Sequence, residues 1–336
     1  MQMSIKLINT FPFNLVIGEG GLIYLNTLIK HAGEEIRDKK ITHIYSSYRP
    51  FADHYAAYKL KKRNPDVVWI ADFRDLIIDP HYNHIFFKDS HHAFFKRMFS
   101  RADFLTTVSD GLAEKLKKYN PEVLTIRNGI KNVPDRLVEN HCKYFKIAYT
   151  GSMFLDKRNA EPLFVAIRDL INKKMMVEDH VRIIYAGKDS HIWQDLASRL
   201  QLDNILVDKG IISGPEATAI QKEACINVLL TISSKELQGV LTGKMIEYFE
   251  SGSPVLAIIV GQNDPELKFI FNEIEIGDSF SDQPADLPAI TDFIYREYIH
   301  WKNTGTNRKP VNLKMLKDKY SVEATMKPLL DRIVKK

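Results

Sequence analysis

Lys244 and Glu247 lie three residues apart near the middle of the stretch 239–260. Residues at this spacing share one face of a helix. A helix start presents unpaired N–H groups and a partial positive charge, which attract an anion such as phosphate, and Lys244 adds a full charge. The Glu247 carboxylate can accept two hydrogen bonds, which suits a pair of adjacent sugar hydroxyls. The pattern therefore indicates half of a nucleotide-sugar site, the alternative being a solvated Lys–Glu pair on an ordinary amphipathic helix.

The elements that would position these two residues follow from local sequence. Thr242 and Gly243 predict the helix start, because the threonine hydroxyl can accept a backbone N–H that would otherwise stay unpaired. Residues 251–254, Ser-Gly-Ser-Pro, predict its end, since glycine adopts the left-handed cap and proline cannot continue a helix. The run 255–260 is apolar throughout, which predicts a strand buried on both faces of a parallel sheet.

Bulk composition bounds the class of protein. The chain has 336 residues, 45% hydrophobic and 26% charged, which is typical of a globular protein with room for two domains. A net charge of +5 permits anionic substrates or an anionic membrane surface and specifies neither. No apolar run reaches membrane-spanning length and no secretory cleavage site is present, so a cytoplasmic location is expected. Cys142 and Cys225 stand alone, which excludes a disulfide framework or a zinc ribbon.

Strands and helices alternate through the first half, which predicts a parallel sheet. Ligands of such sheets gather at the carboxyl ends of strands. Asp72, Arg74 and Asp75 follow one of these ends and are the predicted catalytic group, with a structural Arg–Asp pair as the alternative. The predicted elements are a weak strand within 4–16, helices at 22–36, 51–62 and 110–119, and strands at 42–47, 67–72, 104–109 and 123–127.

Histidines, a glycine cluster and a basic helix complete this half. His81, His84, His91 and His92 lack the zinc-site spacing, so no metal is expected. The glycines within 18–21 lack the full phosphate-binding pattern, which favours a plain loop. Residues 93–101 mix phenylalanines with cations; an anionic membrane surface is one interpretation, and a core helix with cationic outer residues is preferred. No recognition motif indicates nucleic acid.

The second half predicts another α/β domain. Its first strand, 145–150, ends in Gly151 and Ser152, where glycine allows close approach of a ligand, and Lys157 and Arg158 follow on the loop. Further strands are expected at 181–186, 205–207, 226–232 and 255–260, and closing helices at 290–301 and 312–334. The predicted domains are 1–140, 141–311 and a C-terminal helix, 312–336, that packs back toward the first domain.

Five stretches in this order resemble family 4-type glycosyltransferases. They are WIADFRD (69–75), ADFLTTVSDGLAEKL (102–116), IRNGI (126–130), IAYTGSM (147–153) and GKMIEYFESGSPVLAI (243–258). The resemblance implies the GT-B fold, an α/β architecture in which two Rossmann-like domains face each other across a cleft. It also implies transfer, with retention, from a nucleotide-sugar donor to a glycan or lipid-linked acceptor in bacterial-type surface polysaccharide synthesis, without metal or other cofactor. Localisation would be cytoplasmic, with peripheral contact at the inner face of an anionic membrane.

The resemblance also assigns roles to residues. Glu247 would hold the donor ribose, Lys244 with Lys157 or Arg158 the diphosphate, and the group at residues 72–75 would lie on the acceptor side. The complete donor-side set is Gly151, Ser152, Lys157, Arg158, Gly239, Thr242, Gly243, Lys244 and Glu247.

Two departures from the family keep other functions in view. Gly239 stands where relatives carry a second glutamate, with Glu236 the closest acid upstream, and the first domain is expected either to be reduced or to lack the family's opening. A nucleotide-sugar epimerase of the same fold and a non-catalytic nucleotide-binding scaffold are the alternatives.

Overall fold

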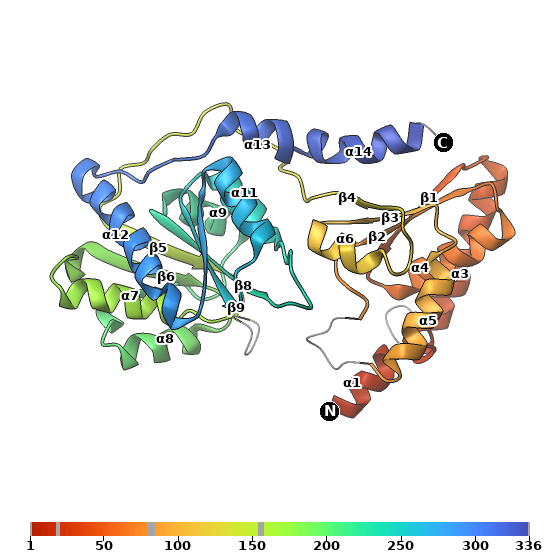
Figure 1. Ribbon diagram of the computed structural model, residues 1–336, viewed down its shortest axis with the longest axis horizontal. Coiled ribbons are helices and arrows are strands. Elements are labelled where there is room, and N and C mark those ends of the chain that lie inside the picture. The colour runs from red at the N-terminus through yellow and green to blue at the C-terminus, as the bar shows by residue number, and fades with distance from the viewer. Residues whose placement is uncertain (1, 18–20, 79–84, 154–157, 335–336) are drawn as a thin grey trace. The chain divides into compact units, whose positions relative to one another are not determined.

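The chain forms two compact units, shown in Figure 1, a computed structural model that describes residues 2–17, 21–78, 85–153 and 158–334. Unit 1 comprises residues 1–127 and 326–336, and unit 2 comprises residues 128–325. Each unit is built on its own parallel β-sheet. The α/β class expected from the alternation of strands and helices is therefore confirmed.

Unit 1 has a four-stranded sheet of order β1-β2-β3-β4, in which every pairing is parallel. Its strands are β1 (His43–Tyr48), β2 (Val68–Phe73), β3 (Phe104–Thr107) and β4 (Val123–Thr125). Its helices are α1 (Gln2–Asn9), α2 (Phe13–Val16), α3 (Gly21–Asp38), α4 (Phe51–Arg63), α5 (Lys88–Phe99), α6 (Asp110–Leu116) and the end of α14 (Val322–Val334).

Both faces of this sheet are covered. Successive side chains of a strand point to opposite faces, and β2 shows the consequence. Trp69 and Phe73 pack among residues of α4 and α5. Ile70 packs with Ile126 and with Leu329 of α14. The apolar composition of β2 thus reflects burial on two sides.

The helices of unit 1 contradict one prediction, the strand within 4–16, and confirm another, the core helix at 93–101. The weak strand within 4–16 is wrong, because α1 and α2 occupy this segment. Met3 and Leu7 recur at helical spacing, and Pro12 lies just before α2, where a missing N–H costs little. The core interpretation of residues 93–101 is confirmed, since Phe95 and Met98 of α5 are buried in the core.

Unit 2 has a six-stranded parallel sheet of order β10-β9-β8-β5-β6-β7. Its first two strands in sequence, β5 (Phe145–Thr150) and β6 (Val181–Ala186), match the predicted ranges. Because β5 pairs with β6 on one side and β8 on the other, the strand order reverses between β5 and β8. The other strands are β7 (Leu206–Asp208), β8 (Ile226–Ser233), β9 (Val255–Gly261) and β10 (Gly277–Ser281).

Helices flank this sheet. They are α7 (Glu161–Asn172), α8 (Ser190–Arg199), α9 (Gly214–Glu223), α10 (Gly243–Ser251), α11 (Pro265–Ile274), α12 (Leu287–Thr304) and α13 (Leu313–Tyr320), with short 3₁₀ turns at Glu178–His180, Asp203–Ile205 and Pro284–Asp286. The predicted closing helix 312–334 is two helices, because the backbone around Ser321 is extended and bonds to Ile130. None of the described helices combines the length and apolarity needed to cross a membrane.

Candidate functional site

A pocket of about 490 Å³ lies in unit 2 at the carboxyl ends of β5 and β6. It falls within the range of about 300–1,000 Å³ typical of small-molecule sites. β5 borders the point where strand order reverses, and open α/β sheets bind ligands outside such a switch point. The described lining is residues 150–152, 186–188 and 211–214, with Ala217, Thr218, Lys244 and Glu247.

The side chain of Lys244 lies directly over Gly151. A Cβ added to Gly151 would come within 2.2 Å of both Cε and Nζ of Lys244. The backbone of Gly151 has a φ of +136°, which side-chain-bearing residues avoid. A Cβ on Gly187, at the end of β6, would lie 2.2 Å from the carbonyl oxygen of Gly151. Gly151 therefore leaves room for the ammonium group of Lys244, and Gly187 leaves room for the carbonyl oxygen of Gly151.

A second cation lies close to Lys244. The guanidinium of Arg158 donates hydrogen bonds to the carbonyl oxygen of Ser152 at 2.5 Å and to the hydroxyl of Tyr149 at 2.9 Å. Burial lowers the pKa of Lys244, Glu247 raises it, and Arg158 lowers it, so that the net shift is downward. A bound anion would offset the effects of burial and of Arg158 on Lys244, because a nearby negative charge favours the charged form of the amine. Lys157 lies outside the described residues.

Glu247 is oriented by a residue that the sequence analysis does not identify. Nε2 of Gln221, on α9, donates to Oε2 of Glu247 and to Oγ1 of Thr150, both at 2.9 Å. Gln221 is 1% exposed, and the two donors of its amide nitrogen are both used. The exposed carboxylate of Glu247 is thus connected to the end of β5. A single glutamine within a helix has no distinctive spacing, so no sequence signal points to it.

α10 starts where the sequence predicts, but the predicted capping hydrogen bond does not form. Thr242 precedes the helix with an extended backbone, yet its hydroxyl makes no bond to the first turn. Its Oγ1 is buried without a hydrogen-bond partner among the described residues. The predicted hydroxyl cap is therefore wrong, although Gly243 begins the helix as expected.

Gly239 has a backbone role in the structure. It is buried with a φ of +71°, and its N–H donates to Oδ2 of Asp264 at 2.7 Å. Asp264 is 2% exposed and also caps α11 by accepting two backbone N–H groups. Glu236 is exposed in a turn, where Oγ of Ser234 donates to its carboxylate at 3.2 Å. Neither acid belongs to the described lining of the pocket.

The predicted catalytic group follows β2 in unit 1. Asp72 is 1% exposed, and its carboxylate accepts hydrogen bonds from Oγ1 of Thr106 at 2.7 Å, Oγ of Ser47 at 3.1 Å and Nε of Arg74 at 2.7 Å. Burial lowers the pKa of Arg74 and Asp72 raises it, with a net rise. Asp75 is exposed. Asp72 thus connects the ends of β1, β2 and β3, and a catalytic role for the group stays a prediction.

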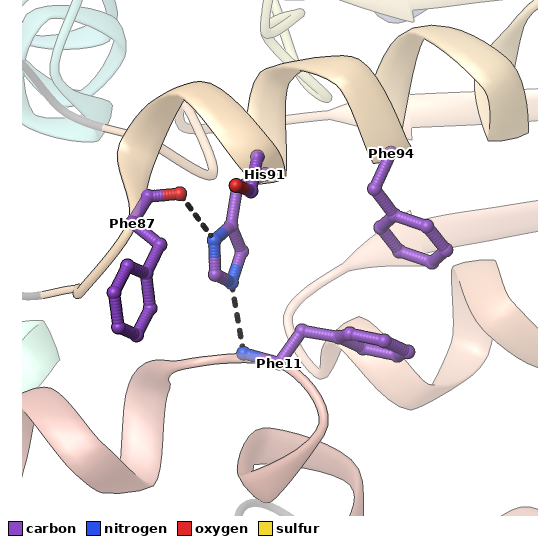
Figure 2. Close-up of a pocket in the computed structure, with 5 residues that line it drawn as sticks. Phe11, Phe87, His91 and Phe94 are labelled. Carbon is purple, nitrogen blue, oxygen red and sulfur yellow. Dashed lines mark hydrogen bonds between the residues drawn. The ribbon is translucent and has the colours of Figure 1, made fainter.

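The histidines of unit 1 have protein partners where they are described. Nδ1 of His91 donates to the carbonyl oxygen of Phe87 at 3.0 Å, and Nε2 accepts the N–H of Phe11 at 2.9 Å, as Figure 2 shows. Nδ1 of His92 lies 2.6 Å from the hydroxyl of Tyr119. Residues 81 and 84 fall outside the described residues. Across the described part of the chain, no three His, Cys, Asp or Glu side chains are grouped as metal ligands; metal independence stays a prediction.

No protein-family model matches the sequence, and a search of curated proteins finds no match. Solved structures do match. The lipopolysaccharide outer core galactosyltransferase WaaB, apo form, aligns with a TM-score of 0.58 and 11% identity over 94% of this chain and 81% of that chain. Sucrose-phosphate synthase from Thermosynechococcus elongatus gives a TM-score of 0.61 at 14% identity, over 93% of this chain and 79% of that one.

A third similar structure is the pneumococcal O-GlcNAc transferase GtfA in complex with UDP and GlcNAc. Its TM-score is 0.54 at 11% identity, over 90% of this chain and 59% of that chain. Identities this low show the fold alone. The chain has the GT-B fold, with two Rossmann-like domains built on parallel sheets, as the sequence predicts.

Proposed function

We propose that this protein is a retaining glycosyltransferase that moves a sugar from a nucleotide-sugar donor to a glycan or lipid-linked acceptor. The observation that carries the proposal is the arrangement inside the pocket of unit 2. Lys244, in the first turn of α10, lies over Gly151 at the end of β5. Glu247, three residues further along α10, accepts a hydrogen bond from Gln221 that orients its carboxylate. A cationic helix start and an oriented carboxylate match the diphosphate and the ribose of one nucleotide.

Binding would divide among these groups by charge. The diphosphate lies against Lys244, Arg158 and the N–H groups of the first turn of α10, since a helix N-terminus favours an anion. The ribose hydroxyls donate to Glu247, and each hydrogen bond to a charged group contributes about 1.5–3 kcal/mol. The nucleoside then extends along the pocket wall formed by residues 211–214.

The same cations serve the chemical step. Negative charge grows on the diphosphate as its bond to the sugar's anomeric carbon breaks, and fixed positive groups lower the barrier by stabilising that charge. The acceptor hydroxyl attacks from the face that the diphosphate leaves, forms the new glycosidic bond, and passes its proton to a diphosphate oxygen. This route retains the anomeric configuration and needs no protein base. We include metal independence in the proposal, because Lys244 and Arg158 supply the positive charge.

The structures in the comparison suggest the first substrates to test. The GtfA structure holds UDP and GlcNAc, so UDP and UDP-sugars come first, followed by GDP. Surface polysaccharide assembly in a bacterial cytoplasm is the proposed setting, with a glycan or a lipid-linked intermediate as acceptor. Gly239 contributes backbone instead of a carboxylate, so selection of the donor sugar falls to other groups.

The test is a thermal-shift titration with UDP and GDP, followed by a donor-hydrolysis screen with and without EDTA. A ligand that binds the native state raises its melting temperature, and Glu247→Ala is expected to abolish the rise. Glu250→Ala, three residues further along α10 and outside the described lining of the pocket, is the control that keeps it.

Three outcomes would separate the alternatives. An unchanged shift in Glu247→Ala removes that residue from the ribose role. Free nucleotide with an epimerised sugar and no need for an acceptor identifies an epimerase. A nucleotide-induced shift without turnover of any donor, in the presence of acceptors, identifies a scaffold.

A further inference from the structure

Exposed apolar side chains concentrate at one end of unit 1. Ten of the twenty large apolar side chains that are exposed in the described residues belong to residues 3–8, 13–17 and 22–24 or to Phe87. We call these ten the N-terminal apolar surface. The most exposed are Ile23 at 85%, with Met3 and Phe87 at 77% each. Soluble proteins expose single apolar residues freely, whereas a concentration of this kind marks an interaction surface.

Two of the segments that carry this surface are fixed to each other. Oγ1 of Thr10 accepts the N–H of Phe86 at 2.9 Å, and the N–H of Phe11 donates to Nε2 of His91 at 2.9 Å. The ring of Phe11 stacks on Phe94 with centroids 4.4 Å apart. The junction between α1 and α2 is therefore held against the beginning of α5. Figure 1 shows α1 at the end of unit 1 that lies away from α14.

A groove opens beside Phe87, a member of this surface. Figure 2 shows the rings of Phe11 and Phe94 on one side of His91 and the ring of Phe87 on the other. The groove has a volume of about 180 Å³, below the range of about 300–1,000 Å³ for small-molecule sites. Its size suits part of a hydrocarbon chain better than a whole ligand.

Charges of both signs lie next to the surface, since the hydroxyl of Tyr24 donates to Asp53 at 2.7 Å, but unit 1 as a whole is cationic. Lys6 has its ammonium group 5.7 Å from the ring centroid of Phe86, and Lys88 follows Phe87, next to Asp89. Residues 1–33 contain a single acidic residue, Glu19. Unit 1 as a whole carries 23 Lys and Arg against 15 Asp and Glu, whereas unit 2 carries 24 against 27. The apolar surface thus belongs to the cationic unit.

We propose that the N-terminal apolar surface docks on a lipid bilayer that contains anionic lipids. Its apolar side chains enter the interfacial layer, and Lys6 and Lys88 meet the headgroups, which is the usual division in peripheral binding. The docking element is not the part of α5 that the sequence suggests, because Phe95 and Met98 face the core. This proposal rests on unit 1 alone and does not depend on the donor site.

The test is co-sedimentation of the full chain with vesicles of phosphatidylcholine, with and without phosphatidylglycerol. The wild type is expected to pellet with the anionic vesicles, less so as salt is raised, and to stay soluble with the neutral ones. Ile23→Asp combined with Phe87→Asp is expected to lower the partition coefficient by about tenfold or more. Phe269→Asp, at a 63% exposed position of α11 in unit 2, is the matched control and keeps wild-type binding.

The proposal is overturned if the double variant partitions like the wild type, or if the wild type ignores anionic vesicles. A dimer in light scattering that the double variant dissociates also overturns it, because the surface would then bind a second copy. The thermal shift with UDP is measured on the same samples. Its absence alongside intact vesicle binding counts against the donor site only.

Discussion

Gln221→Leu tests whether the orientation of Glu247 matters for nucleotide binding. Leucine has a similar volume and lacks the amide that donates to both Glu247 and Thr150 at 2.9 Å. Without it the carboxylate is no longer held in the orientation that we propose for ribose binding. If one ribose hydrogen bond to Glu247 is lost, the cost is about 1.5–3 kcal/mol, which corresponds to a roughly 10- to 150-fold loss of affinity. UDP affinity by calorimetry should fall within that range.

A purely structural effect needs a separate readout. Gln221→Glu places a second carboxylate beside Glu247, and the two can share a hydrogen bond only when one is protonated. Its UDP affinity is therefore expected to recover as the pH is lowered toward about 5, where wild-type affinity changes less. Gln194→Leu is the matched control, since Gln194 donates to Asp208 at 3.2 Å on an exposed part of the same unit. If Gln221→Leu melts like the wild type and binds UDP equally well, the positioning role is refuted.

Two further predictions concern stability. Gly151→Ala should lower the free energy of unfolding by about 1–3 kcal/mol, because the Cβ meets Lys244 and strains the backbone; Gly214→Ala, whose Cβ meets nothing within 4 Å, should not. Burial lowers the pKa of His54 from 6.5 to about 3. The neutral ring therefore stabilises unit 1 above pH 6.5, and up to about 5 kcal/mol is lost as pH falls toward 3. Urea titrations followed at Trp69, the tryptophan of unit 1, check this loss, which His54→Phe should reduce.

The strands of unit 2 are predictable because burial on two faces leaves a strong local pattern. β5 and β6 are short, mostly apolar runs, each followed by glycine, and their predicted bounds hold. The segment before residue 17 lacks such a pattern. Its helices are fixed by partners about 80 residues away, among them the bond from Phe11 to His91, and local sequence does not encode those partners.

The candidate site likewise has features that local sequence predicts and features that depend on the fold. The spacing of Lys244 and Glu247 predicts their shared helix face, because an interval of three residues is a local property. The packing of Lys244 on Gly151 and the bond from Gln221 to Glu247 join β5, α9 and α10, so they depend on the fold. Thr242 shows the limit of a local rule, since its backbone suits a cap and its hydroxyl does not make the bond.

The charge distribution bears on the proposed nucleotide binding, because the pocket geometry would have to supply the affinity for the nucleotide. Unit 2 has three more acidic than basic residues, so its overall field does not attract an anionic nucleotide. Charges beyond a Debye length of about 8 Å are largely screened at physiological ionic strength, and only nearby groups count. Lys244 and Arg158 are such groups; burial lowers the pKa of Lys244 most, and Arg158 lowers it further. In the proposed function, a bound diphosphate would offset both effects, because a nearby negative charge favours the charged form of Lys244.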